Sequence, residues 1–209
     1  KEVMKMIDAT PGMTMVLHTF GSDMKYHIHT HSLVTFGGLD KAGNWVYPKD
    51  KYVIAKYRKI CSTYKRIFLE LLESSFANNE ITYHEDYATL SKEVTKLRWV
   101  VHTTYPTMNT ELIENYLARY VNRVAISNNR LNYLKENEEV AITYNDYKKQ
   151  EAGKPCPKEV KILEPLVAIN QILQHVLPRH FQKTRNYGIH NACNKLKESA
   201  EEKIKANAK

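Results

Sequence analysis

The sequence predicts an α+β fold, in which a central antiparallel sheet carries a histidine motif and helices pack on it, one of them bearing a tyrosine pair. Residues 13–20 and 26–36 read as strands separated by a short turn, a pattern typical of a hairpin. Residues 55–76 instead repeat apolar side chains at three- and four-residue spacings, as a helix with one buried face does. Asn109 or Thr110 can cap a further helix that runs from 111 to 120 or 121.

The second predicted strand contains alternating histidines. His27, His29 and His31 occupy every second position, so an extended strand projects all three from one face. Imidazoles on one face typically bind a metal ion or hold a polar centre where charge develops. The alternative is a half-exposed strand whose polar face happens to carry histidine. In a symmetric hairpin His18 lies opposite or near His29 and is a candidate third ligand, whereas a shift of one residue puts it on the other face.

Composition narrows the class of protein. The chain has 209 residues, enough for one sizeable domain, and no apolar run reaches membrane-spanning length. The first ten residues lack the apolar core of a signal peptide. The three cysteines are far apart and form no C-x-x-C pair, which argues against a disulfide framework and favours a reducing, cytoplasmic setting. A net charge of +8 and a pI near 9.2 favour a polyanionic partner, nucleic acid before acidic membrane.

Other elements are expected along the chain. Short strands are predicted over 99–103, 124–127 and 139–147. A polar helix is predicted over 87–95 and an apolar helix over 164–175. The charged tail from Lys195 is expected to be an exposed helix or frayed.

The predicted helix over 111–121 carries two tyrosines. Tyr116 and Tyr120 are four residues apart, which places both hydroxyls on one helix face, and Arg119 and Arg123 form an adjacent basic ridge. On spacing alone, two amphipathic tyrosines packed along a helix explain the pair equally well. Combined with the histidines, the pair suggests phosphoryl transfer. A tyrosine hydroxyl is a weak nucleophile, and a histidine-bound divalent ion would polarise a phosphodiester for its attack.

These features together resemble the HUH single-strand DNA endonucleases, and most closely the two-tyrosine rolling-circle transposases of bacterial insertion sequences. The resemblance extends over most of the chain, with its blocks in the family's order. They are residues 16–21, 27–39, 116–129, 144–147, 175–178 and 185–188.

The resemblance implies a metal pair at His29 and His31, directly ahead of residues 32–34. The residue between them is usually bulky and apolar in the family but is Thr30 here, so His27 and His29 are the alternative pair. His18 lies in a family block and stays the candidate third ligand. The implied ion is Mg²⁺ or Mn²⁺, although imidazoles on chemistry alone suit softer ions equally well.

The implied activity is rolling-circle transposition. Tyr116 or Tyr120 would attack single-stranded or hairpin DNA at the element's end, leaving a 5′-phosphotyrosine and a free 3′-hydroxyl. The other tyrosine would serve the second cleavage or strand transfer. Basic residues are candidates for contacts with backbone phosphates, with an ordinary solvated face as the alternative for each. They are Arg119, Arg123, Lys56, Arg58, Lys59 and Lys65.

The expected organisation is a catalytic domain over 1–190 followed by a charged tail over 191–209. The resemblance also implies a cysteine-rich zinc-binding module and a first sheet strand upstream of Lys1, so the sequence is expected to be a fragment or a decayed copy. Two other functions remain open. A replication initiator or relaxase shares the chemistry, but the block at 185–188 favours the transposase. An inactive truncated remnant would keep DNA binding without turnover.

Overall fold

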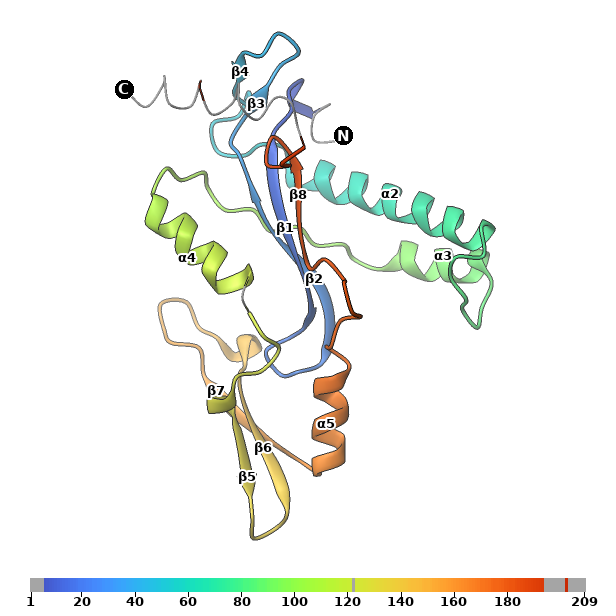
Figure 1. Cartoon of the computed structure of the whole chain (residues 1–209), viewed down its shortest axis with the longest axis vertical. Coiled ribbons are helices and arrows are strands. Elements are labelled where there is room, and N and C mark those ends of the chain that lie inside the picture. The colour runs from blue at the N-terminus through green and yellow to red at the C-terminus, as the bar shows by residue number, and fades with distance from the viewer. Residues whose placement is uncertain (1–5, 122, 194–201, 203–209) are drawn as a thin grey trace. The chain divides into compact units, whose positions relative to one another are not determined.

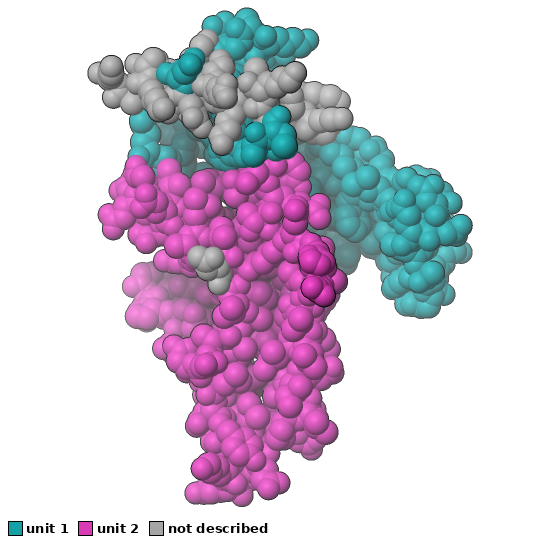
Figure 2. All heavy atoms as spheres, in the orientation of Figure 1, with its two compact units in different colours: residues 1–12, 34–108, 188–209 teal, residues 13–33, 109–187 magenta. Residues whose placement is uncertain are grey.

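The computed structural model describes residues 6–121, 123–193 and 202, and divides the chain into two compact units (Figures 1 and 2). Unit 1 comprises residues 1–12, 34–108 and 188–209, and unit 2 comprises residues 13–33 and 109–187. The predicted α+β fold class is confirmed, because helices and antiparallel sheets both form. The boundary expected at 190 stays a prediction, and the tail from Lys195 lies outside the described residues except for residue 202.

The histidine motif lies in a three-stranded sheet of order β2-β1-β8. Strand β1 (Gly12–Phe20) and strand β2 (Tyr26–Val34) form the predicted hairpin, with Val16 and His18 of β1 buried. Strand β8 (Thr184–Gly188) lies on the other side of β1, and the Leu17 amide donates to the Lys183 carbonyl at 3.0 Å. The central position of β1 buries its side chains on both faces, which fixes where His18 points.

A second three-stranded sheet completes unit 2 together with helix α5 (Pro165–Leu173). Its antiparallel strands are β5 (Leu131–Leu134), β6 (Glu139–Asn145) and β7 (Lys158–Leu163), with β6 in the middle. The strand expected over 139–147 and the apolar helix expected over 164–175 therefore form, each ending two residues earlier than predicted. Short 3₁₀ helices, Asn128–Arg130 and Tyr147–Lys149, precede β5 and follow β6.

The turn of the histidine hairpin is anchored inside unit 2. The Asn145 amide of β6 donates to the Ser22 hydroxyl at 2.9 Å. The buried His175 donates from Nε2 to the Met24 carbonyl at 3.0 Å and accepts at Nδ1 from the Thr19 hydroxyl at 3.2 Å. Because both ring nitrogens have partners within unit 2, His175 serves the structure of the turn. These bonds hold the turn and therefore the register of β1 against β2.

Helix α4 (Thr110–Val121) carries the tyrosine pair in unit 2. Its start agrees with the sequence, because the Asn109 side chain accepts from the Leu112 amide at 3.1 Å, as an N-terminal cap does. The strand expected over 124–127 is wrong, because residues 123–127 have no regular structure. The Arg123 carbonyl bonds a lysine side chain instead of a neighbouring strand, and Val124 is 63% exposed.

Unit 1 contains helix α2 (Tyr57–Ala77), helix α3 (Tyr87–Lys96) and a two-stranded sheet of β3 (Gly38–Leu39) and β4 (Trp45–Val46). Helices α2 and α3 lie side by side (Figure 1). In the described part of the chain, no helix is long and apolar enough to cross a membrane.

The strand expected over 99–103 is wrong, because these residues have no regular structure. The Trp99 ring packs against Tyr64 and Phe68 of α2, with ring centroids 5.4 and 5.1 Å away. Its indole N–H donates to the Val94 carbonyl at 3.4 Å. The largest apolar residue of the segment therefore packs on a helix, while Val100 is 73% exposed.

Gly188 provides a stability test of the junction at the end of β8. Its φ is +59°, and an added Cβ would lie 1.7 Å from the Pro11 carbonyl oxygen. Gly188→Ala is therefore expected to lower the free energy of unfolding by about 2–4 kcal/mol. Gly153→Ala is the matched control: its φ is also positive, at +77°, but nothing lies within 4 Å, so it should cost only about 1 kcal/mol. Urea denaturation measures both, and equal losses would contradict the expected clash.

Candidate active site

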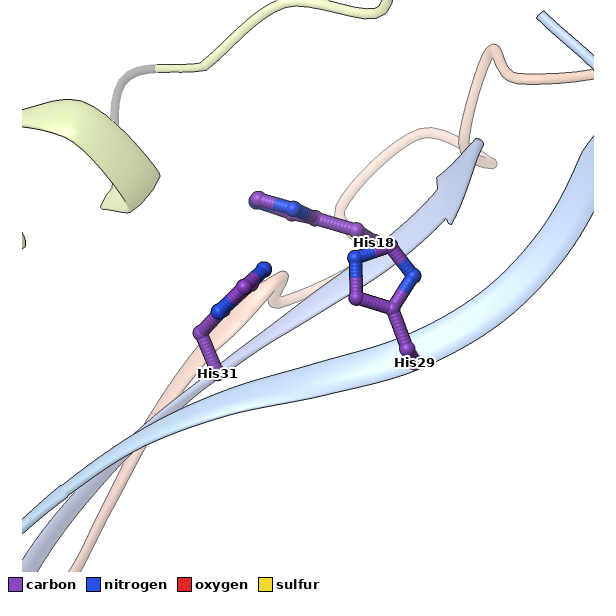
Figure 3. A group of neighbouring side chains, drawn as sticks. All are labelled: His18, His29 and His31. Carbon is purple, nitrogen blue, oxygen red and sulfur yellow. The ribbon is translucent and has the colours of Figure 1, made fainter. Parts of the chain in front are cut away.

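Three histidines of unit 2 face one another across the hairpin. Figure 3 shows His18 of β1 and His29 and His31 of β2 pointing toward one another. Their ring centroids are 4.9 to 5.4 Å apart, and one nitrogen of each lies within 4.8 Å of those of the other two. His27 lies beside His29, at 4.9 Å between ring centroids, but is outside this group. The structure thus brings His18, His29 and His31 together and leaves His27 as an exposed neighbour.

Each of the three rings has a nitrogen available to bind an ion. His29 Nδ1 lies 2.9 Å from the His27 carbonyl and His18 Nε2 lies 2.9 Å from the Tyr120 carbonyl, so these nitrogens carry the protons. His18 Nδ1 and His31 Nε2 are buried and have no hydrogen-bond partner. Buried polar atoms without partners are rare in folded proteins. The orphaned nitrogens belong to rings that each place one nitrogen within 4.8 Å of the others, so the donor set fits a divalent metal ion.

Burial also keeps the three imidazoles neutral. Burial, with the neighbouring His18 and His29, lowers the pKa of His31 to about 4. It lowers the pKa of His18 and His29 as well, although in each case a hydrogen bond to a backbone carbonyl opposes the shift. A neutral imidazole presents a lone pair, and metal binding requires that form. At neutral pH the group is therefore ready to coordinate an ion.

Both tyrosines of α4 lie against the histidine group. The Tyr120 ring stacks on His31 with centroids 3.7 Å apart and planes 22° from parallel. The Tyr116 ring lies 4.6 Å from Tyr120 and 6.2 Å from His31. Burial and the neighbouring Tyr120 raise the pKa of the Tyr116 hydroxyl, and the Ser32 backbone opposes that shift. Residues separated by about a hundred positions in the sequence thus form one cluster.

Comparison with known proteins shows the family to which the chain that carries this cluster belongs. The family model described as "Putative transposase" matches residues 12–197, nearly the whole chain. The chain belongs to this family, the two-tyrosine transposases. The matched residues include both the histidine hairpin and the tyrosine helix.

Two curated relatives agree with this family membership. The chain is 31% identical over 193 residues to "Putative transposase y4qJ" of Sinorhizobium fredii (strain NBRC 101917 / NGR234), covering 88% of this chain and 47% of the relative. It is 25% identical over 181 residues to "Transposase for insertion sequence element IS801" of Pseudomonas savastanoi pv. phaseolicola, covering 85% and 43%. The chain therefore spans less than half the length of these relatives. No solved structure matches it significantly.

In this two-tyrosine family member, the end of the tyrosine helix is tied to the sheet at two points. His18 donates to the Tyr120 carbonyl, so the same side chain that can bind an ion also holds α4. The Lys183 ammonium donates to the Arg123 carbonyl at 2.7 Å and to the Val121 carbonyl at 3.5 Å. A cation suits the negative end of a helix dipole. Sequence reasoning missed Lys183, because nothing in its local pattern distinguishes it from a surface lysine.

The candidate DNA-contacting residues are divided between the two units. Arg119 is exposed on α4, and the Arg123 guanidinium lies 5.8 Å from the Phe20 ring centroid, both in unit 2. The Lys65 ammonium joins the two helices of unit 1 by donating to the Thr95 and Leu97 carbonyls. The other three candidates are exposed at the start of α2: Lys56, Arg58 and Lys59.

Lys183→Met is expected to lower the free energy of unfolding by about 1–2 kcal/mol, because the carbonyls at the end of α4 lose a charged donor. Lys183→Arg should restore most of the loss. Lys135, exposed in the turn between β5 and β6, gives the matched control Lys135→Met. Urea denaturation measures the three variants, and a Lys183→Met loss no larger than that of the control would show that the tie to α4 is unimportant.

Proposed function

We propose that the chain is the catalytic part of a rolling-circle transposase, which cleaves and rejoins single-stranded or hairpin DNA at the ends of its element through a 5′-phosphotyrosine. The observation that carries the proposal is the stacking of Tyr120 on His31, with Tyr116 beside it, against three neutral imidazoles. DNA is the substrate that family membership implies. Such a substrate would be met in the bacterial cytoplasm, which we propose as the location of the protein.

The donor atoms for a divalent ion would be His18 Nδ1, His29 Nε2 and His31 Nε2, the nitrogens not used in hydrogen bonds. When bound, Mg²⁺ or Mn²⁺ would supply Lewis-acid polarisation of a phosphoryl oxygen. Mg²⁺ takes mainly oxygen ligands, so Mn²⁺ is the ion for the tests below. The chain's own contribution is to hold the three rings neutral and facing one another.

The tyrosines would perform the covalent step. One phenol oxygen attacks the phosphorus of the scissile phosphodiester, a tyrosine–phosphorus bond forms and the P–O3′ bond breaks. The phenol proton ends on the leaving 3′ oxygen, so the products are a 5′-phosphotyrosine and a free 3′-hydroxyl. A 3′-hydroxyl attacks the phosphotyrosine to rejoin the strand, and the proton returns to the phenol. One phosphodiester replaces another at each step, so no external energy source is required.

The reaction needs an activated phosphate because neither phenol is a strong nucleophile at neutral pH. Burial raises the pKa of Tyr116, which keeps its hydroxyl protonated until attack. Arg119 lies between the two tyrosines on α4 and Arg123 lies just beyond the end of the helix, and their charges would hold the neighbouring phosphates of the strand. The side chains would thus orient the substrate while the polarised phosphate supplies the reactivity.

The test is the formation of a covalent protein–DNA adduct. Single-stranded oligonucleotides that tile the DNA flanking the gene, labelled at the 3′ end, are incubated with the protein and Mn²⁺ and separated under denaturing conditions. We expect an adduct that resists detergent, is digested by protease and requires Mn²⁺. The double variant Tyr116→Phe, Tyr120→Phe should form none, whereas Tyr133→Phe, at an exposed tyrosine of β5, should behave as the wild type.

Two results would overturn the proposal. An adduct that survives in the double variant would assign the nucleophile to another residue. No adduct from the wild type with any of the tiled oligonucleotides would instead make the chain a DNA-binding remnant.

A further inference from the structure

Unit 1 exposes aromatic rings where a stable fold would not require them. Tyr52 and Tyr57 are 52% and 54% exposed, and Tyr105 is 76% exposed. The Tyr52 and Tyr105 rings lie edge to face with centroids 5.7 Å apart, although they come from distant parts of the sequence. We call residues 51–59 together with Tyr105 the tyrosine–cation surface.

Cations accompany these rings. Residues 51–59 include four basic residues and no acidic residue. The Lys51 ammonium lies 4.9 Å from the Tyr52 ring centroid. The Arg58 guanidinium lies 6.0 Å from the Tyr57 ring centroid, and its Nε donates to the Tyr57 hydroxyl at 3.1 Å. Each exposed ring of this segment therefore has a positive charge beside it.

The position of these charges is unfavourable for the helix that carries them. Arg58 and Lys59 lie in the first turn of α2, which has no acidic residue and no side-chain cap. Cations at the positive end of a helix dipole reduce its stability. Further along α2, Arg66 pairs with Glu70 at 2.6 Å and the Lys65 ammonium bonds to backbone carbonyls. The unpaired cations at the start are better explained by an anionic ligand than by the stability of α2.

We propose that the tyrosine–cation surface binds single-stranded DNA through base stacking on Tyr52 and Tyr105 and through phosphate contacts from Lys51 and Arg58. Aromatic faces bind unpaired bases without sequence preference, and neighbouring cations hold the backbone. A duplex hides its base faces and offers only phosphates, so the exposed rings select single strands. The surface belongs to unit 1, whereas the histidines and tyrosines of the candidate active site belong to unit 2.

The proposal rests on the proposed function only in taking DNA as the polymer. A transposase that acts on single strands has to hold DNA beyond the phosphate it cuts. A binding surface outside the active site would retain the strand between successive cleavages.

The test measures binding without cleavage. The Tyr116→Phe, Tyr120→Phe protein is titrated into fluorescein-labelled (dT)20 without added metal, and anisotropy gives the dissociation constant. Adding Tyr52→Ala and Tyr105→Ala should weaken binding at least about fivefold, the lower end expected for loss of stacking on one base. Adding Tyr52→Phe and Tyr105→Phe keeps the rings and should keep the affinity. Tyr83→Ala with Tyr133→Ala removes two similarly exposed tyrosines, 47% and 54%, and should change nothing.

A salt titration separates stacking from charge. Lys51→Gln and Arg58→Gln should each reduce the slope of log affinity against log salt concentration by about 0.7, the value for one phosphate contact with a single strand. The alanine pair at Tyr52 and Tyr105 should leave that slope unchanged.

Three results would overturn the inference. The first is that the alanine pair binds (dT)20 as tightly as its parent. The second is that the pair weakens binding to a 20-base-pair duplex as much as binding to (dT)20, and the third is that it weakens binding to (U)20 RNA alone. Circular dichroism confirms that each variant is folded. This assay uses a chain that lacks both candidate nucleophiles, so it does not depend on cleavage. A negative binding result would not contradict the cleavage proposal, and a negative cleavage result would not contradict the binding proposal.

Discussion

Replacing His31 by alanine is expected to weaken Mn²⁺ binding at least about a hundredfold, because even outer partners of metal ligands change affinity by about 10- to 100-fold. The same variant should form the covalent adduct about a thousandfold more slowly, since metal polarisation of a phosphate supplies several kcal/mol and each 1.36 kcal/mol is tenfold in rate. His31 is an informative position to test because its Nε2 is buried and has no hydrogen-bond partner, so its replacement removes a candidate metal ligand without breaking a hydrogen bond of that atom.

The matched control is His27→Ala. His27 is exposed, and its ring lies 4.9 Å from His29 but outside the group of facing nitrogens. Its contribution to the site is a backbone carbonyl, which accepts from His29 and survives the substitution. Mn²⁺ affinity, measured by the loss of the free-ion electron paramagnetic resonance signal, should stay near that of the wild type. A larger loss from His27→Ala than from His31→Ala would move the metal pair to His27 and His29.

The geometry of the hairpin was predictable from local patterns. The side-chain period of a strand puts His29 and His31 on one face, and a symmetric turn brings His18 opposite them. The structure has this arrangement. The sequence left open the register of the two strands. A shift of one residue would have placed the His18 side chain on the other face of the sheet. The bonds from Asn145 and His175 to the turn hold the register, and these come from elements more than a hundred residues away.

The packing of the tyrosine helix was not predictable. Spacing showed that Tyr116 and Tyr120 share a face, but not that Tyr120 stacks on His31 at 3.7 Å while the Tyr116 ring lies 6.2 Å from it. That difference depends on where the end of α4 is held, through the Lys183 side chain and a carbonyl bond to His18. Side chains that bond to backbone carbonyls leave no periodic signal in a sequence.

Strands were the least predictable elements. Strand β8 was missed because Thr184–Gly188 is mostly polar and joins β1 through backbone bonds, which any side chain permits. The segment at 99–103 was taken for a strand because it is apolar, but Trp99 instead packs on α2. A short apolar run indicates burial without specifying the partner.

Single replacement of either tyrosine by phenylalanine is expected to separate cleavage from strand transfer. Each phosphotyrosine occupies one phenol, so a second covalent link needs the other tyrosine. The two ring centroids lie 4.6 Å apart beside His31, so in the proposed mechanism both phenols would lie near the same phosphate. On a substrate with two cleavage sites, Tyr116→Phe and Tyr120→Phe should each reduce doubly cleaved and joined product about a thousandfold or more, the scale for loss of a nucleophile.

Each single variant should still form an adduct with a one-site oligonucleotide, because one phenol remains. Phenylalanine keeps the ring, so Tyr120→Phe retains the stacking on His31 and Mn²⁺ affinity should be unchanged. Adduct and joined product are quantified on the same denaturing gel, with Tyr133→Phe as the control. If Tyr116→Phe yields joined product at the wild-type rate, Tyr120 suffices for both steps, and the adjacent Tyr116 serves packing rather than chemistry. The same result from Tyr120→Phe would assign both steps to Tyr116.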